Sequence, residues 1–373
     1  MKVFQRWYHD CLIKRHQEVL VERKARKGRG AVSNATGRYE SLVHEAVDDG
    51  WGLADDPPLL RTSLSLDTAK RVISYNQSPD VSFDRSVNPY RGCEHGCVYC
   101  FARPTHTWLG LSAGLDFESR LFYKPDAVER LREELSSIQY QCQPLALGIN
   151  TDAYQPVERK VGLTRRILEL LAEVRHPVIL VTKSSLIERD LDLLVPMAAS
   201  QLVSVSISIS TLSTSLSRRL EPRAASPERR LETMRIIADA GIPLTLLMAP
   251  VIPVMTDSEM ETILQAGREA GASSAAYVLL RLPHEVRDLF IEWLEEHEPL
   301  RASHVMSKIR EMRGGREYDS RFGSRMKGEG VYAELLKQRF RLALKRYGYL
   351  DAPSLDTSAF CHPLRPGHQM SLF

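Results

Sequence analysis

Short apolar runs alternate with amphipathic stretches through the middle of the chain. Runs of strand length lie at residues 145–150, 178–182, 202–209, 244–248 and 275–280. Apolar positions recur with a helical period at residues 125–137, 163–174, 186–197, 227–240, 257–270 and 284–296. Strands that alternate with helices build a parallel sheet covered by helices. With a cysteine-containing segment opening the series, the pattern predicts an α/β protein with about six consecutive βα units.

The segments on either side of this region have a different character. Residues 1–72 combine charged runs and turn-forming residues with little apolar periodicity, so we expect an irregular, basic and partly mobile N-terminal extension. The βα units occupy residues 73–297. Residues 298–368 form a basic, helical C-terminal region with an amphipathic helix at residues 331–347, and residues 369–373 form a separate tail.

Composition is that of an ordinary soluble globular protein. Hydrophobic residues make up 43% and charged residues 26% of the 373 residues. The longest apolar stretch, residues 242–255, contains three prolines and is too short to cross a bilayer. The first residues are polar and lack a signal-peptide pattern, so we expect a cytoplasmic protein.

Positive charge is concentrated in two segments, although the formal net charge is only +3. Lys and Arg crowd residues 23–29 and residues 308–327. Clustered cations of this kind are typical of a phosphate-binding surface, and they also occur on solvated helix faces and tails. The sequence leaves both alternatives open for each cluster.

Three cysteines, Cys93, Cys97 and Cys100, lie in the short segment Arg-Gly-Cys-Glu-His-Gly-Cys-Val-Tyr-Cys-Phe. Three thiolates hold three irons of a 4Fe-4S cube, whereas an electron-carrier cluster has four cysteine ligands. The fourth iron is then open to a small molecule, to which the cluster can pass one electron. The spacing therefore indicates a catalytic cluster.

The alternative is a structural zinc ion, with His95 or the distant Cys361 and His362 completing four ligands. Zinc ligands usually come as two close pairs, which this spacing does not provide. Disulfides are disfavoured, because Cys11, Cys142 and Cys361 are scattered in a way that is typical of a reducing compartment.

The three-cysteine loop, with Tyr99 before its last cysteine, resembles the signature loop of the radical S-adenosylmethionine (SAM) enzymes. In that superfamily the open iron binds SAM, and one electron from an external reductant cleaves it to methionine and a 5′-deoxyadenosyl radical. The residue at the position of Tyr99 lies against the adenine. The resemblance implies a partial (β/α)6 barrel, because six units are too few to close an eight-stranded barrel, with functional residues at the carboxyl ends of the strands.

Polar residues at the ends of the predicted strands resemble the subgroup that contains spore photoproduct lyase, a DNA repair enzyme. An ammonium pairs with a carboxylate and a carboxylate with a cation, as SAM binding requires. The resemblance implies that the carboxylate and amine of SAM are held by Thr151, Asp152, Lys183 and Ser208, with Arg223 as a second contact to the carboxylate. For the segment around Arg223, the alternative is a surface ion pair with Glu221.

The resemblance covers about residues 80–300 and departs from the subgroup in two places. The lyase has a hydrogen-donating cysteine directly before its Ser-Asp pair, where this chain has Asn150. The nearby Cys142 precedes the strand, so we expect it at the opposite end, as a buried structural thiol. Val254 stands where the subgroup often has glycine, so adenine should pack more tightly there.

The last five residues resemble the short peptide by which bacterial replication and repair proteins bind the DNA polymerase sliding clamp. In such a peptide two apolar anchors fill a groove and a glutamine makes orienting hydrogen bonds. The matching residues are Gln369, Met370, Leu372 and Phe373. A tail that packs on its own domain is the alternative.

Taken together, these features predict a radical SAM enzyme with a 4Fe-4S cluster, acting on DNA as a lyase-like repair enzyme. Radical modification of a peptide, an RNA or a small metabolite is a second hypothesis. A third is a nucleic-acid-binding protein whose iron-sulfur cluster is structural. The sequence leaves open the substrate, the hydrogen-atom donor and whether SAM is consumed.

Overall fold

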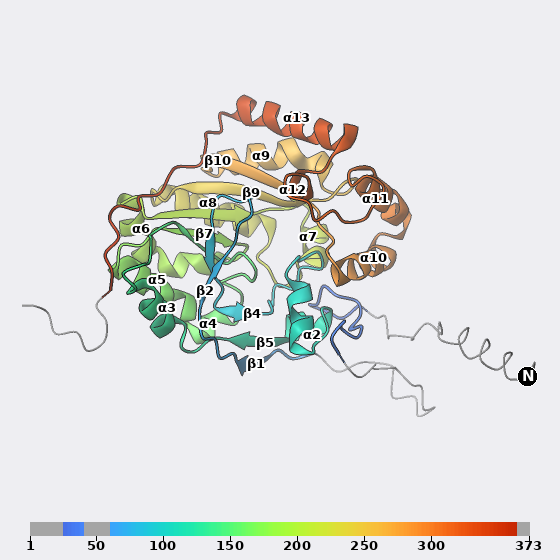
Figure 1. The fold of residues 1–373 in the computed structure, drawn as a ribbon. Helices are drawn as coiled ribbons and strands as arrows, with labels where there is room; N and C mark the ends of the chain where they lie inside the picture. The colour runs from blue at the N-terminus through green and yellow to red at the C-terminus, as the bar shows by residue number, and fades with distance from the viewer. Residues whose placement is uncertain (1–24, 41–59, 364–373) are drawn as a thin grey trace, which may run out of the picture.

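Six parallel strands and one antiparallel edge strand form the main sheet of the protein. The computed structural model describes residues 25–40 and 60–363 (Figure 1). Within these residues the strand order is β10-β9-β8-β7-β6-β3-β2. The bounds are β2 (Ile73–Tyr75), β3 (Arg85–Val87), β6 (Leu145–Leu147), β7 (Val178–Thr182), β8 (Val203–Ser208), β9 (Leu244–Val251) and β10 (Ser274–Leu279). Neighbours from β3 to β10 are parallel, and only β2 runs antiparallel, which confirms the predicted partial barrel.

The helices predicted between the strands cover the outer face of this sheet. They are α3 (Ala127–Leu135), α5 (Leu163–Glu173), α6 (Leu191–Ala199), α8 (Pro227–Asp239) and α9 (Met260–Glu269), whereas α10 (Glu285–His297), which follows the last strand, joins the core cluster that contains Cys97 and Tyr99. Two of them begin as 3-10 turns, η3 (Ser185–Asp190) and η4 (Asp257–Glu259). The start of α8 follows the rule for N-terminal caps, since the Ser226 hydroxyl accepts a hydrogen bond from the Arg229 amide at 3.2 Å.

The hydrophobic core lies between the sheet and these helices. In β8 and β9, Val205 and Leu246 are fully buried on that side. The alternate residues Ser204, Ser206 and Thr245 are only half-buried on the inner face, as the two-residue period of a strand requires. The barrel interior is therefore lined with small hydroxyl side chains near its middle.

Strand β6 ends earlier than the predicted residues 145–150 because of Gly148. This residue has a φ of +87°, and a Cβ atom there would lie 2.5 Å from the Val181 carbonyl oxygen. Only glycine fits both the conformation and the space. The chain turns here, and Asp152 comes to the carboxyl end of the sheet.

A second, small sheet leads into the loop that contains the three cysteines. The sequence pattern did not predict this sheet. It consists of β1 (Ser63–Leu66), β5 (Arg120–Tyr123) and β4 (Tyr90–Arg91) in the order β1-β5-β4. The cysteine loop, residues 92–101, follows β4 directly. It is followed by η2 (Arg103–Leu109) and α2 (Leu115–Ser119). Two short helices, α4 (Glu158–Val161) and α7 (Thr214–Leu220), complete the connections around the loop.

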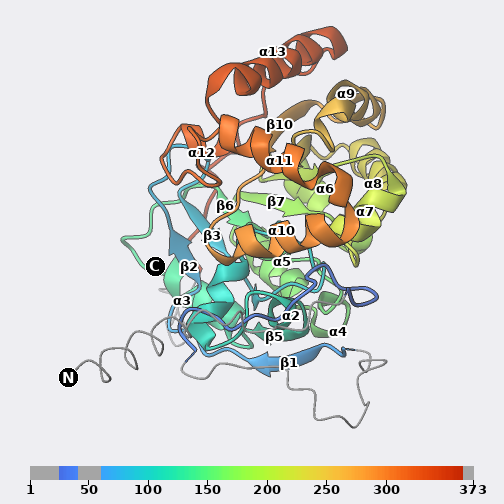
Figure 2. The ribbon, with the colours of Figure 1, turned by 90° about the vertical axis from the view of Figure 1, so that its right-hand side faces the viewer.

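The C-terminal region is helical, as predicted. It contains α11 (Pro299–Glu311), α12 (Ser324–Lys327) and α13 (Gly330–Tyr347). Figure 1 shows α13 lying across α9 and β10, and Figure 2 shows α10 and α11 side by side. Just beyond α13, the Tyr349 hydroxyl donates to the Leu264 carbonyl at 2.6 Å. In the described part of the chain, no helix has the length and apolarity needed to span a membrane.

Residues 25–40 contain no helix or strand, but they pack against the cysteine loop. Residues 29–33 are buried. Arg29 is 7% exposed and donates to the Glu118 carbonyl at 2.7 Å and the Leu60 carbonyl at 2.6 Å. Arg29 therefore belongs neither to a phosphate-binding surface nor to a solvated tail, the two alternatives for the first basic cluster. Its guanidinium is buried and binds carbonyl groups of the protein itself.

Candidate active site

The cysteine loop lies over the carboxyl ends of the barrel strands. His95 Nδ1 is 3.3 Å from Asp152 Oδ2, beyond the end of β6. The Tyr99 hydroxyl is 3.4 Å from the Ser210 hydroxyl, just after β8. The Lys183 ammonium, just after β7, lies 5.9 Å from the centre of the Tyr99 ring. The fold therefore brings Asp152 and Lys183, which the sequence analysis had singled out, together with Tyr99 and with Ser210, which it had not.

The three thiols have the surroundings of metal ligands. Cys93 and Cys97 are buried, Cys100 is half-buried, and all three are free of disulfides. Burial raises the pKa of Cys97 to about 12, and it raises the pKa values of Cys93 and Cys100 as well. Thiols of this kind lose their protons to a metal rather than to water. Their burial fits an enclosed metal cluster.

The zinc alternative loses its proposed fourth ligands. The Cys361 amide donates to the Val174 carbonyl and His362 contacts the Leu135 carbonyl, so this pair lies at the ends of α5 and α3 and not at the cysteine loop. His95 is engaged by Asp152. Among the described residues, no three His, Cys, Asp or Glu side chains gather around one ion. Thiolates that bind separate irons of a cube do not need to converge on a single point.

Asp152 is held by four donors. Oδ1 accepts hydrogen bonds from the Thr182 hydroxyl at 2.7 Å and the Tyr154 amide at 2.9 Å. Oδ2 accepts from the Lys183 amide at 2.8 Å and contacts His95. Burial alone would raise the pKa of Asp152, but His95 and these hydrogen bonds hold it below its usual value. The carboxylate is thus charged, and it links the ends of β6 and β7 to the cysteine loop.

A second polar group surrounds Tyr99. Its hydroxyl donates a short hydrogen bond to Glu221, and Glu221 also pairs with Arg230. Burial alone would raise the pKa of Glu221, but the charges of Arg230 and Lys183 lower it. Burial alone would lower the pKa of Lys183, but negative charge at Cys97 and Glu221 raises it. Lys183 is therefore an ammonium at the cysteine loop, without a carboxylate ion pair among the described residues.

The remaining predicted residues lie close to this site. Thr151 is buried and donates to the Tyr90 carbonyl at 3.0 Å, and Ser208 donates to the Ala249 carbonyl at 3.1 Å. Arg223 is 3.1 Å from Glu94 of the cysteine loop. The alternative of a surface pair between Arg223 and Glu221 is wrong, because Glu221 is 3% exposed and pairs with Arg230.

The chain departs from the spore photoproduct lyase subgroup at Asn150 and at Val254, and the structure places both residues. Asn150 is exposed just beyond the end of β6, and its amide donates to the Asn88 side chain at 3.1 Å. Cys142 precedes β6, at the end of the strand where it was predicted, but it is half-buried and not buried as expected. Val254 has a φ of +69°, a region that favours glycine and is strained for a β-branched residue. This strain explains why glycine suits the position.

Several residues that position the cysteine loop were missed by the sequence analysis. Arg103 is fully buried, and it donates to the Cys97 carbonyl at 2.9 Å and the Gly96 carbonyl at 3.1 Å. Gln155 is also fully buried, and it accepts from the Glu94 amide at 2.8 Å. No periodicity or spacing marks these residues, since their burial arises only when the small sheet packs on the barrel.

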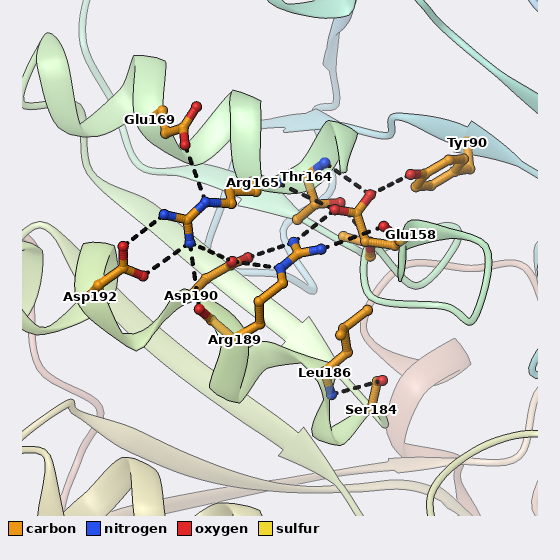
Figure 3. A network of polar contacts seen from close by, with 11 residues as sticks. Tyr90, Glu158, Thr164, Arg165, Glu169, Ser184, Leu186, Arg189, Asp190 and Asp192 are labelled. Carbon is orange, nitrogen blue, oxygen red and sulfur yellow. Dashed lines mark hydrogen bonds and ion pairs between the residues drawn. The ribbon is translucent and has the colours of Figure 1, made fainter. Parts of the chain in front are cut away.

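A buried network fixes the strand that leads into the cysteine loop (Figure 3). Glu158 accepts from the Tyr90 hydroxyl, from the Thr164 amide at 3.0 Å and from Arg189 at 2.8 Å. Arg189 also binds Asp190 at 2.7 Å. The network joins β4 to the connections that follow β6 and β7, which carry Asp152 and Lys183. The network therefore fixes the position of β4 relative to the segments that carry Asp152 and Lys183.

The sequence matches the family model described as the radical SAM superfamily over residues 87–266. This match includes the cysteine loop and, in full, the four parallel strands β6 to β9. The chain belongs to the radical SAM superfamily. It is a radical SAM enzyme whose individual reaction the comparisons do not identify.

The chain is also similar to other proteins and to solved structures. An uncharacterized protein of Mycobacterium tuberculosis is 35% identical over 232 residues, which cover 62% of this chain and 67% of the relative. One of Methanocaldococcus jannaschii is 26% identical over 191 residues, 51% of this chain and 68% of the relative. Structures of spore photoproduct lyase, one of them complexed with dinucleoside spore photoproduct, superpose with a TM-score of 0.54, 16% identity and coverage of 76% and 79% of the two chains. At this identity the likeness shows a common fold.

Proposed function

We propose that this radical SAM enzyme cleaves SAM reductively at a 4Fe-4S cluster held by Cys93, Cys97 and Cys100, and that it acts on DNA as a lesion-repair lyase does. When bound, such a cluster supplies one electron and an open iron for SAM. The observation that carries the proposal is the position of the cysteine loop, with two buried thiols and one half-buried thiol, over strand ends that present Asp152 and Lys183.

The residues around the thiols have distinct parts in this proposal. Lys183 offers an ammonium that no described carboxylate pairs with directly, so it is suited to the carboxylate of SAM. Arg223 approaches from the other side of the cysteine loop as a second cation for that carboxylate. Tyr99, held by Glu221, presents its ring for adenine.

Asp152, Thr151 and Ser208 complete the proposed SAM site. Asp152 provides negative charge for the amine of SAM, and its four hydrogen-bonding contacts also make it a positioning residue for the cysteine loop. Thr151 and Ser208 bring hydroxyl groups to the same rim from β6 and β8, where each now donates to a carbonyl.

DNA is the proposed substrate because the fold is shared with a lyase whose structure contains a dinucleoside photoproduct. Asn150 occupies the place at which the resemblance puts a hydrogen-donating cysteine, and Cys142 is at the other end of the strand. We therefore propose a DNA lesion other than the spore photoproduct, with a hydrogen donor other than a thiol at this position. Reaction in a reducing compartment fits the free thiols of the described cysteines.

The test is anaerobic incubation of reconstituted protein with SAM, a one-electron reductant and irradiated DNA. We expect 5′-deoxyadenosine in the reaction and a change in the mass of nucleosides released from the DNA. The same incubation without DNA measures uncoupled SAM cleavage. Formation of 5′-deoxyadenosine without any change in DNA would favour the peptide, RNA or metabolite hypothesis. Binding of DNA without 5′-deoxyadenosine would favour the non-catalytic one.

We also propose that residues 369–373 bind the DNA polymerase sliding clamp. These residues lie outside the described part of the chain, so this proposal rests on Gln369, Met370, Leu372 and Phe373 of the sequence alone. A short peptide with two apolar anchors binds weakly and raises local concentration without a permanent complex. Such a contact would bring a repair enzyme to DNA.

A further inference from the structure

The two edges of the partial barrel are bridged by one segment, residues 313–328, which we call the strap. At the β10 edge, Arg313 of the strap donates to the Leu280 carbonyl at 3.1 Å. At the other edge, Arg325 binds Asp80, in the connection between β2 and β3, with 2.5 Å between Nε and Oδ2. Figure 2 shows α12, the helical part of the strap, beside β10 and above β2. The strap therefore crosses the open side of the barrel.

Arg281 lies between the strap and the cysteine loop. It follows β10, and its guanidinium is 5.4 Å from the centre of the Phe101 ring. Phe101 is the residue directly after Cys100, and it is 40% exposed. Arg281 is thus a cation at the rim of the proposed active site, on the open side of the barrel.

The donors of Arg281 are almost unused. Its Nε is buried and has no hydrogen-bond partner among residues 25–40 and 60–363. Within the same residues, its two other nitrogens contact only the Tyr318 hydroxyl at 3.4 Å and the Met326 sulfur at 3.6 Å. These are long contacts to weak acceptors, whereas a guanidinium normally meets carboxylate, carbonyl or phosphate oxygens at shorter distances. The guanidinium of Arg281 can therefore still donate hydrogen bonds to the oxygens of an anion such as phosphate.

The charge of Arg281 helps to lower the pKa of Asp80, but no described carboxylate forms a direct ion pair with Arg281. Arg313 is buried nearby and donates only to carbonyl groups, and burial together with the charge of Arg281 lowers its pKa although Asp319 acts in the opposite direction. Neither arginine appears in an ion pair with a carboxylate of the described residues. The carboxylates close to them are already paired, Asp80 with Arg325 and Asp319 with Arg321.

Aromatic rings stand beside these cations. Phe101 lies under Arg281, and Phe322, which is 58% exposed, lies under Arg325 at 4.5 Å. Arginine beside an exposed aromatic ring is the arrangement that binds single-stranded nucleic acid, with the cation on the phosphate and the ring against a base.

We infer that Arg281 binds a phosphate group of the substrate next to the cysteine loop, with Phe101 as the stacking surface for the adjacent base. This inference deepens the proposed function and rests on it for the identity of the phosphate as part of a DNA strand. The strap then holds the strand against the open side of the barrel, where an extruded or single-stranded nucleotide reaches the proposed SAM site.

The test is binding of a fluorescein-labelled oligothymidylate of about 12 nucleotides to the full-length protein, measured by anisotropy over a range of salt concentrations. We expect Arg281→Gln to weaken binding by roughly tenfold and to lower the slope of log K against log salt by about 0.7, the value for one phosphate contact on a single strand. Arg281→Lys should keep the slope and lose only part of the affinity. Arg341→Gln, an exposed arginine on α13, is the matched control and should change neither.

The outcomes separate this inference from the proposed function. If wild-type protein binds the oligonucleotide and Arg281→Gln binds it with the same affinity and slope while remaining folded by circular dichroism, the inference is wrong and the DNA proposal stands. Calorimetry with pyrophosphate provides the second arm. Arg281-dependent binding of pyrophosphate without binding of the oligonucleotide would retain the phosphate site and overturn DNA as the substrate. Binding of neither probe to wild-type protein would overturn both.

Discussion

Arg103 and Glu118 form an ion pair in which both side chains are fully buried, with 2.5 Å between Nη2 and Oε1. Arg103 also holds two carbonyl groups of the cysteine loop. Glu118 in turn accepts from the amides of Gly30 and Ala31, at 2.9 and 2.8 Å. One buried charge pair thus fastens the N-terminal segment to the loop that carries the thiols.

Glu118→Gln should therefore damage both stability and cluster binding. Removing one partner of a buried pair leaves the other charge uncompensated, at a cost of about 3 kcal/mol in the free energy of unfolding. Chemical denaturation and iron content after reconstitution are the measurements. The control is Glu133→Gln, which removes an exposed pair with Arg130 and should change stability by less than about 0.5 kcal/mol. Equal effects in the two variants would show that the buried pair has no special role.

Each of the three loop cysteines should be required for the cluster. Cys93→Ser, Cys97→Ser or Cys100→Ser is expected to lower iron and sulfide content and to abolish 5′-deoxyadenosine formation, since no described fourth cysteine lies at the loop. Cys142→Ser should retain both, because Cys142 precedes β6 at the opposite end. Purified protein that contains zinc in place of iron would contradict the assignment.

Lys183→Ala should weaken SAM binding by roughly tenfold or more, since it removes a charge-assisted hydrogen bond to the carboxylate. The cluster itself should still form, because Lys183 makes no side-chain hydrogen bond to the cysteine loop in the described structure. Equilibrium binding of SAM and the absorption of the cluster distinguish the two effects. Lys160→Ala, an exposed lysine of α4, is the control. A variant with normal SAM affinity would remove Lys183 from the proposed site.

Stability should fall in mild acid because of buried histidine. Burial lowers the pKa of His176 to about 4, below the ordinary value of about 6.5. Its Nδ1 faces the Pro177 carbonyl at 2.9 Å and so donates to it, which leaves Nε2 to accept from the Tyr140 hydroxyl at 2.7 Å. Protonation is therefore resisted in the folded state and free in the unfolded one.

The sign of this linkage is definite. Above about pH 6.5 the neutral His176 does not oppose folding. As the pH falls from about 6.5 to about 4, the free energy of unfolding decreases, because the unfolded state takes up the proton more readily. Below about pH 4 the loss is constant, at about 3 kcal/mol. His106, whose pKa burial also lowers to about 4, acts in the same direction. His176→Gln should reduce the slope of unfolding free energy against pH in this window, and the exposed His304→Gln should not. An unchanged slope in both variants would refute the linkage.

Deleting residues 369–373, or changing Leu372 and Phe373 to Ala, should abolish binding to the sliding clamp. Binding of the full-length protein is expected in the micromolar range, because a short peptide loses conformational entropy when it docks. Calorimetry measures the affinity, and 5′-deoxyadenosine formation should be the same in both proteins. Absence of binding by the full-length protein at tens of micromolar would refute this proposal.

The sequence by itself determined the main sheet and the helices between its strands, and it marked three cysteines as the proposed cluster ligands. The apolar run at residues 178–182 predicted a buried strand, and β7 has the same bounds. The three cysteines are neighbours in the chain, so their spacing is legible in the sequence without the fold. The strands and helices follow from the local periodicity of apolar residues, and the parallel pairing follows from the order in which strands and helices alternate.

Tertiary structure alone decided how the cysteine loop is held and what faces its open side. Arg103, Glu118 and Gln155 look like surface residues in the sequence, and they become buried only because the small sheet and residues 25–40 pack over the barrel ends. Glu221 finds Arg230 in place of Arg223 for the same reason. Arg281, far from Phe101 in the chain, reaches it because the carboxyl ends of parallel strands meet at one rim. Burial of charge is a property of packing, which no local pattern in the sequence records.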